Sequence, residues 1–126
     1  MTPQILTRFL WLLALSISGF AHADATPLKA VQVAERVWFV QGQAALGTPE
    51  NRNFISNAGF VVTDEGVVVV DALGSPALAQ ELLAEIKRVT PQPVRYVIVT
   101  HYHADHIYGL QTFKAAGATV LAHAKG

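Results

Sequence analysis

The alternation of apolar and polar residues divides most of the chain into short strands. Strands are predicted where apolar side chains recur at every second position or form continuous β-branched runs. Runs of this kind occupy residues 30–33, 37–40, 53–62, 67–71, 94–100 and 118–123. The sequence TDEG at 63–66 predicts a hairpin turn, because its glycine accepts positive φ. Glycine and proline in residues 41–53 predict a loop.

Two segments carry a helical pattern instead. Ser75 suits the N-cap and Pro76 the first helical position, and Thr90-Pro91 ends this helix. Its apolar face is formed by residues at helical spacing, namely Leu78, Leu82, Ile86 and Val89. Residues 105–117 predict a second helix, with Gly117 as its terminator.

From residue 67 onward the elements alternate as β-α-β-α-β, which predicts parallel strands joined by right-handed crossovers. Both helices then cover one face of the sheet. Strands 67–71 and 94–100 are apolar on both faces, so the other face is left bare. Parallel sheets normally have both faces covered, so we expect a missing partner or a missing C-terminal half, and a truncated chain.

Composition narrows the class of protein. The chain has 126 residues, a formal net charge of zero, 52% hydrophobic residues and 14% charged residues. These values predict one globular domain at most and argue against disorder. No basic run is present, so nucleic acid is not an expected partner. No cysteine is present, so any metal ligand within this chain must be nitrogen or oxygen.

The first 23 residues resemble a targeting segment. Arg8 precedes the apolar run 9–20, and the small residues AHA follow at 21–23. Spanning a bilayer takes about 20 apolar residues, so this run predicts a cleaved signal peptide rather than a stable anchor. We expect cleavage after Ala23 and a mature chain, residues 24–126, in the periplasm or outside the cell.

Three of the five histidines crowd into the stretch IVTHYHADHIYG at 98–109. Residues two apart in an extended segment point to the same side, so His101 and His103 aim at one point. Asp105 and His106 fall where the chain turns into a helix and face a neighbouring direction. Imidazole and carboxylate suit zinc, iron or manganese, and zinc is the default. The bland alternative is a histidine-rich surface loop.

Two further candidates stand at strand ends. Asp71 and His123 each follow a predicted strand, as the histidine stretch does, and the carboxyl ends of parallel strands form sites at one rim. A serine-hydrolase interpretation lacks its G-x-S-x-G elbow.

HYHADH at 101–106 resembles the H-x-H-x-D-H signature of the metallo-β-lactamase-fold hydrolases. The surrounding sequence follows that family's N-terminal half in order. THYHADHIYGL, with the signal peptide, is most similar to the periplasmic quinoprotein-relay zinc metallohydrolase group. The resemblance implies an α+β fold, the four-layer αββα sandwich, of which only the N-terminal αβ half, residues 24–126, is present.

The resemblance also implies roles. His101 and His103 would bind a first metal, and Asp105 and His106 a second, with Asp105 also orienting the nucleophile. Asp71 would hold a ligand by a hydrogen bond, or else cap the following loop. The remaining ligands (two histidines and a bridging aspartate) would come from the second half of the family domain. In that pattern the last candidate, His123, has no ligand role.

The implied activity is that of a zinc-dependent hydrolase with one or two Zn2+ ions. Hydroxide held by the metal would attack the carbonyl of a small-molecule lactam, lactone, ester or thioester. Two alternatives remain open: an iron-dependent redox relative of the same fold, and a non-catalytic truncated fragment. The truncated chain alone is expected to be inactive, and the 41–53 loop is a plausible cover for the site.

Overall fold

A computed structural model describes residues 27–125 of the chain. The strands are β1 (Val31–Ala34), β2 (Val37–Val40), β3 (Ala58–Thr63), β4 (Gly66–Val70), β5 (Val94–Val99) and β6 (Thr119–Ala122). The helices are α1 (Pro76–Val89), α2 (Ala104–Ile107) and α3 (Leu110–Ala115). The predicted signal peptide, residues 1–23, lies outside the described residues. Among residues 27–125, no helix has the length and apolar character needed to cross a bilayer.

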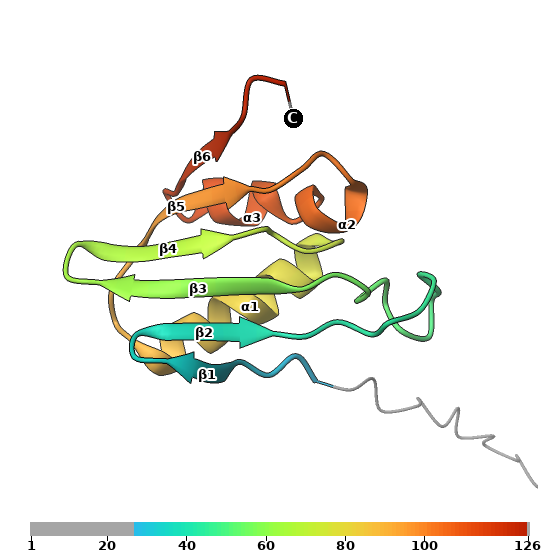
Figure 1. Cartoon of the computed structure of the whole chain (residues 1–126), viewed down its shortest axis with the longest axis horizontal. Helices are drawn as coiled ribbons and strands as arrows, with labels where there is room; N and C mark the ends of the chain where they lie inside the picture. Colours follow the sequence, from blue (N-terminus) through green and yellow to red (C-terminus); the bar gives the residue numbers. More distant parts are fainter. Residues whose placement is uncertain (1–26, 126) are drawn as a thin grey trace, which may run out of the picture.

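All six strands form one mixed sheet in the order β1-β2-β3-β4-β5-β6. The first four strands pair antiparallel, whereas β4, β5 and β6 run parallel. The helices lie together behind the sheet in Figure 1, and α1 packs against α3. The parallel β-α-β-α-β arrangement with both helices on one face is therefore confirmed.

The core lies between the sheet and its helices. Trp38, Phe60, Val69 and Val97 are register partners across four neighbouring strands. The last three are buried, and the Trp38 ring stacks on Phe60 with centroids 5.3 Å apart. The helices contribute buried Leu78, Leu82, Ile86 and Phe113 to the same core. Burial of this row holds the helix-covered face together.

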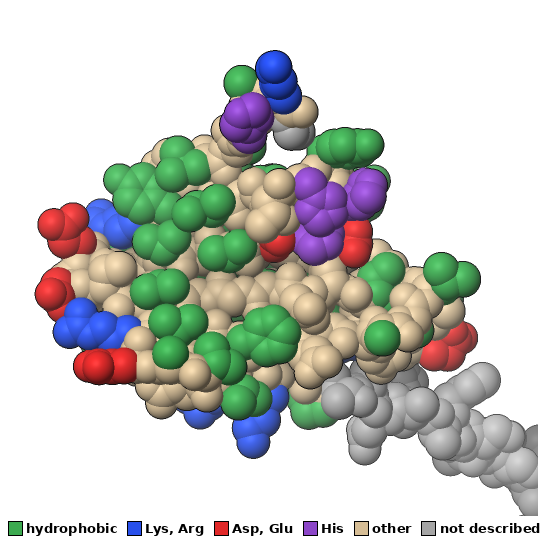
Figure 2. Space-filling model, in the orientation of Figure 1, with side chains coloured by type: hydrophobic (Ala, Val, Ile, Leu, Met, Phe, Trp, Pro, Cys, Tyr) green, Lys and Arg blue, Asp and Glu red, His purple; other side chains and the backbone are tan. Residues whose placement is uncertain are grey.

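The opposite face of the sheet is apolar and uncovered in the described part of the chain. A second row of register partners crosses it, formed by Val31, Phe39, Gly59, Val70, Ile98 and Leu121. Ile98 and Leu121 are 40% and 45% exposed. Apolar side chains spread across this face in Figure 2. An exposed apolar surface on this scale is typical of a face that packs against another element.

Helix α1 has the ends that its sequence predicts. The Ser75 hydroxyl accepts a hydrogen bond from the backbone N–H of Leu78 at 3.2 Å, and Pro76 is the first helical residue. The Ser75 bond satisfies one of the backbone N–H groups that have no partner within the helix. At the other end Thr90 is extended and leaves the helix.

The prediction of one continuous helix over residues 105–117 is wrong. The chain instead forms α2 and α3, separated at Tyr108 and Gly109. The N–H of Gly109 donates to the carbonyl of Leu73 at 3.1 Å, outside any helix. A Cβ at Gly109 would lie 1.9 Å from the carbonyl oxygen of Ala72, so the close approach requires glycine. Packing against the loop after β4 therefore divides the helix.

The strand predicted over residues 53–62 begins later, at Ala58. Arg52 and Asn53 have φ values of 56° and 59°, which an extended strand cannot contain. The carbonyl of Phe54 accepts from Gln43 within the loop rather than from a neighbouring strand. The first apolar residues of this run therefore pack as part of the loop, and only the second half pairs with β2 and β4.

Candidate metal centre

The candidate site lies where two parallel strands end side by side. Strand β4 ends at Val70 and β5 at Val99, and the N–H of Asp71 donates to the carbonyl of Ile98 at 2.9 Å. The histidine stretch follows β5 directly, so its side chains lie next to Asp71. A group of histidine and acidic side chains is visible at this edge of the sheet in Figure 2.

The three histidines of the stretch lie in ring contact. The centroids of the His101 and His103 rings are 4.7 Å apart, edge to face. The centroids of the His101 and His106 rings are 4.0 Å apart. The His101 ring thus lies closer to the His106 ring than to that of its predicted partner His103. The two predicted ligand pairs, His101 with His103 and Asp105 with His106, therefore lie side by side in one cluster.

The carboxylate of Asp71 is buried and fully engaged. Its Oδ1 accepts the backbone N–H of Thr100 at 2.9 Å. Its Oδ2 accepts the Thr100 hydroxyl at 2.7 Å and lies 2.8 Å from Nδ1 of His106. Of the two interpretations of Asp71, the contacts agree with a hydrogen bond to a histidine of the motif. Its role toward a metal stays a prediction.

The loop that carries Asp71 has a strained backbone. Asp71 and Leu73 have φ values of 63° and 66°, a left-handed conformation that costs energy in residues other than glycine. Two backbone hydrogen bonds hold this loop against α2 and its end, from Ala72 to the carbonyl of His106 at 2.8 Å and from Gly109 to that of Leu73. These contacts keep the aspartate and the histidines in register.

Asp105 occupies the side of the cluster next to the 41–53 loop. Its Oδ2 lies 3.5 Å from Nε2 of His106, and its side chain is 26% exposed. Its backbone carbonyl accepts a hydrogen bond from the hydroxyl of buried Ser56. A Cβ at Gly74 would lie 2.8 Å from Nδ2 of Asn53 and 3.3 Å from Cα of Asp105, so the loop ends beside the motif. Whether it covers the site stays a prediction.

His123 follows β6, as predicted, and is exposed. Its Nδ1 accepts the backbone N–H of Lys125 at 3.1 Å. This contact occupies one of the two ring nitrogens, and the absence of a ligand role for His123 stays a prediction.

Sequence reasoning missed Thr100 and Ser56. Thr100 directly precedes the first histidine, and a short hydroxyl side chain at the end of an apolar strand is the signal that was available. Ser56 carries no such signal, because its partner is a backbone carbonyl 49 residues away.

The donors suit zinc but do not complete a site on their own. Imidazole nitrogen and carboxylate oxygen are ordinary zinc ligands. Within residues 27–125, however, no three His, Cys, Asp or Glu side chains are arranged to hold one ion together. Catalytic zinc sites use three protein ligands and keep one open position. The described residues therefore fit part of a zinc centre, in which each pair of side chains would supply two of the ligands.

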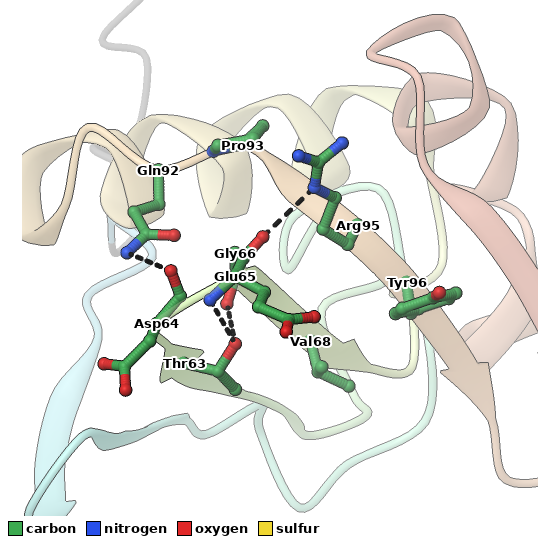
Figure 3. A pocket seen from close by; sticks show the side chains of 9 residues that line it. All are labelled: Thr63, Asp64, Glu65, Gly66, Val68, Gln92, Pro93, Arg95 and Tyr96. Carbon is green, nitrogen blue, oxygen red and sulfur yellow. Dashed lines mark hydrogen bonds between the residues drawn. The ribbon is translucent and has the colours of Figure 1, made fainter.

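A concave surface at the other end of the sheet is a different kind of feature. The β3–β4 turn and the start of β5 form it (Figure 3). The residues that line it are Thr63, Asp64, Glu65, Gly66, Val68, Gln92, Pro93, Arg95 and Tyr96. Its polar side chains bind the turn itself: Arg95 Nε donates to the carbonyl of Glu65 at 3.1 Å, and the Thr63 hydroxyl donates to that of Gly66 at 2.7 Å. These hydrogen bonds stabilise the hairpin. The residues that line this surface form no cluster of histidine and acidic side chains like the one at the other end.

Comparison with known proteins decides the family. The profile of the Metallo-beta-lactamase superfamily matches residues 51–126, more than half of the chain. This chain belongs to the metallo-beta-lactamase superfamily. The match includes the whole histidine stretch, and the resemblance inferred from HYHADH is confirmed at the level of the superfamily.

Individual relatives in the superfamily agree. The chain is 33% identical to a metallo-beta-lactamase type 2 from Bacillus cereus over 86 residues, which cover 68% of this chain and 32% of that protein. It is 35% identical to a linear primary-alkylsulfatase from a Pseudomonas species over 54 residues, covering 43% of this chain and 10% of the relative.

Solved structures share the fold. A metallo-beta-lactamase from Erythrobacter litoralis, in its mono-zinc form, matches with a TM-score of 0.61 and 26% identity, covering 79% of this chain and 45% of that one. The expected αβ portion of the metallo-β-lactamase fold is therefore confirmed. The chain spans about a third of the length of the Bacillus cereus relative and less than half of the Erythrobacter one.

Proposed function

We propose that this chain supplies the first ligands of a zinc-dependent hydrolase centre. The observation that carries the proposal is the cluster itself: three contacting imidazoles and Asp105, braced by buried Asp71, at the carboxyl ends of β4 and β5. His101 and His103 form one pair of ligands, and Asp105 and His106 form the other. Bound zinc supplies Lewis-acid chemistry and lowers the pKa of water toward neutrality.

Contacts within the chain orient the side chains of the site. Asp71 holds the His106 ring through Nδ1, which leaves Nε2 facing Asp105. Asp105 is partly exposed and lies beside His106, so we assign it the role of orienting the attacking water through a hydrogen bond. A carboxylate in this position can hold the nucleophile by a hydrogen bond while it stays in contact with His106.

The substrate class follows from the relatives only in outline. Relatives with assigned activities include beta-lactamases and alkylsulfatases. For this chain we propose a small molecule with a lactam, lactone, ester or thioester carbonyl. The alkylsulfatase similarity suggests a sulfate ester as a second candidate.

Completion of the site requires further residues. Each ligand pair lacks at least one protein ligand, and the uncovered row from Val31 to Leu121 lacks a packing partner. We propose that the remainder of the superfamily fold, or a partner that replaces it, supplies both. Residues 27–125 alone would then bind zinc weakly and turn over substrate poorly.

The narrower assignments remain proposals. Membership of the quinoprotein-relay metallohydrolase group rests on the sequence of residues 100–110 and on the predicted signal peptide. Export to the periplasm rests on residues 1–23. An iron-dependent redox reaction is the competing proposal at the same ligands, and metal analysis of the purified protein separates it from zinc hydrolysis.

The test is zinc binding by the full chain, measured by equilibrium dialysis and metal analysis, together with hydrolysis of a β-lactam, a carboxylic ester and an alkyl sulfate. Zinc retention that disappears in a His101→Ala, His103→Ala double variant supports the proposal. Equal zinc retention by the chain and that variant would refute it. Turnover at enzyme-like rates by the chain alone would contradict the incomplete-site part of the proposal.

A further inference from the structure

Thr100 connects two groups of the cluster that do not touch each other. Its hydroxyl oxygen lies 2.7 Å from Oδ2 of Asp71 and 2.9 Å from Nδ1 of His101. The same aspartate contacts His106 directly. One carboxylate therefore reaches two histidines, one by direct contact and one through a hydroxyl.

The number of available hydrogens determines which group donates and which accepts in this hydrogen-bonded relay. A hydroxyl has one hydrogen to donate, and an ionised carboxylate only accepts. The Thr100 hydrogen must point at Asp71, because otherwise two acceptor oxygens would face each other at 2.7 Å. The Thr100 oxygen can then only accept from His101, so Nδ1 of His101 carries the hydrogen.

We propose that Thr100 is a positioning residue that locks His101 in its Nδ1–H tautomer and so keeps Nε2 as a free lone pair for a metal. Asp71 imposes the same tautomer on His106 by direct contact. Metal-binding histidines are usually fixed in this way, by a hydrogen bond to the other ring nitrogen. The metal-binding consequence rests on the proposed function, whereas the tautomer does not.

The position of Thr100 makes the proposal testable without unfolding the protein. Thr100 follows the last residue of β5 and is exposed. Replacing its hydroxyl by a methyl group in Thr100→Val keeps the shape and the β-branching while removing the relay. Thr100→Ser restores the hydroxyl. Thr119→Val, at an exposed threonine on β6, is the matched control.

The experiment records long-range 1H–15N correlations of the histidine rings in the metal-free full chain, with His101→Ala identifying the His101 signals. The spectra are recorded at about pH 8, above the ordinary pKa of an imidazole. The chain should show His101 as Nδ1–H. Thr100→Val should show a shift toward Nε2–H and about tenfold weaker zinc affinity in a chelator competition. Thr100→Ser and Thr119→Val should behave as the parent chain.

Retention of the Nδ1–H form in Thr100→Val would overturn the proposal, and so would failure of Thr100→Ser to restore it. Should Thr100→Val lose its native amide spectrum, Thr100→Ala provides the same comparison with a smaller side chain. A parent chain that binds no zinc would refute the proposed function, while the ring spectra would still decide the tautomer.

Discussion

The imidazole Nδ1 of His106 lies 2.8 Å from Oδ2 of Asp71, a residue 35 positions earlier in the chain. The contact joins the end of β4 to the short helix α2. Both side chains are largely buried, at 6% exposure for Asp71 and 18% for His106. A hydrogen bond to an ionised group in such a place is stronger than one at the surface. His106 is therefore oriented before any metal arrives.

Asp71→Asn should weaken zinc binding by about 10- to 100-fold, the usual cost of removing a partner that orients a ligand. Asparagine tolerates the left-handed backbone at this position, so the variant isolates the loss of the carboxylate. Chelator competition measures the affinity. Asp64→Asn is the control, because Asp64 is exposed and pairs with Arg36 on the hairpin turn. An unchanged affinity in Asp71→Asn would show that Asp71 has only a structural role.

His103→Ala should lower the zinc content of the chain at least about tenfold, because loss of a direct ligand costs no less than loss of its supporting partner. His103 is exposed, so the fold should remain intact. His123→Ala should leave the zinc content unchanged, since the His123 ring bonds to the backbone of Lys125. Metal analysis after dialysis measures both. Equal losses in the two variants would contradict the assigned ligands.

Gly109→Ala should reduce the free energy of unfolding by about 3 kcal/mol, in the range of an overpacked interior. The added Cβ would lie 1.9 Å from the Ala72 carbonyl oxygen and 2.6 Å from Cβ of Ala79. Gly117→Ala is the comparison. It faces open space at a φ of 93° and should cost roughly 1 kcal/mol through its backbone alone. Urea unfolding measures both, and similar losses would mean that the contact at Gly109 relaxes freely.

Glu85→Gln should destabilise the protein at neutral pH. Hydrogen bonds from Arg88 hold the pKa of the Glu85 carboxyl below its ordinary value, and the N–H of Ala30 also donates to it. Because the folded-state pKa is the lower one, this stabilisation is present above the unfolded-state pKa and is lost as the pH falls through the folded-state value. The substitution should cost about 1 kcal/mol at about pH 7 and less at about pH 3.

Urea unfolding at the two pH values measures this effect. Glu35→Gln, at an exposed glutamate in the β1–β2 turn, is the control and should show little change at either pH. A constant loss in Glu85→Gln across the pH range would mean that the charge of Glu85 is not responsible.

We also propose export with cleavage after Ala23. N-terminal sequencing of the protein from a periplasmic extract should begin at Asp24. Ala23→Asp removes the small residue that signal peptidase needs and should block processing, whereas Asp24→Asn should not. A mature protein that retains Met1 would contradict the proposal.

The sheet and its longest helix follow from local pattern. Strong periodicity and a cap at Ser75 fixed α1, and β-branched runs fixed the parallel strands. The break between α2 and α3 did not follow, because the close approach of Gly109 to Ala72 is a tertiary contact. The late start of β3 has the same origin, in left-handed residues that the apolar pattern conceals.

The site was predictable in its ligand candidates but not in its support. His101, His103, Asp105 and His106 share one short stretch, whose spacing is visible in the sequence. The Thr100 relay depends on Asp71, which lies 29 residues away. Hydrogen bonds across such a separation become visible only when the strands are placed side by side.

The order of the strands in the sheet equals their order along the chain. Each strand can therefore be added at an open edge of the strands that precede it in the chain, and none must be inserted between two others. Asp71 differs, because its partners Thr100 and His106 follow it by 29 and 35 residues in the chain. The Asp71 carboxylate can therefore gain these two side-chain partners only after β5 and α2 have docked beside the end of β4.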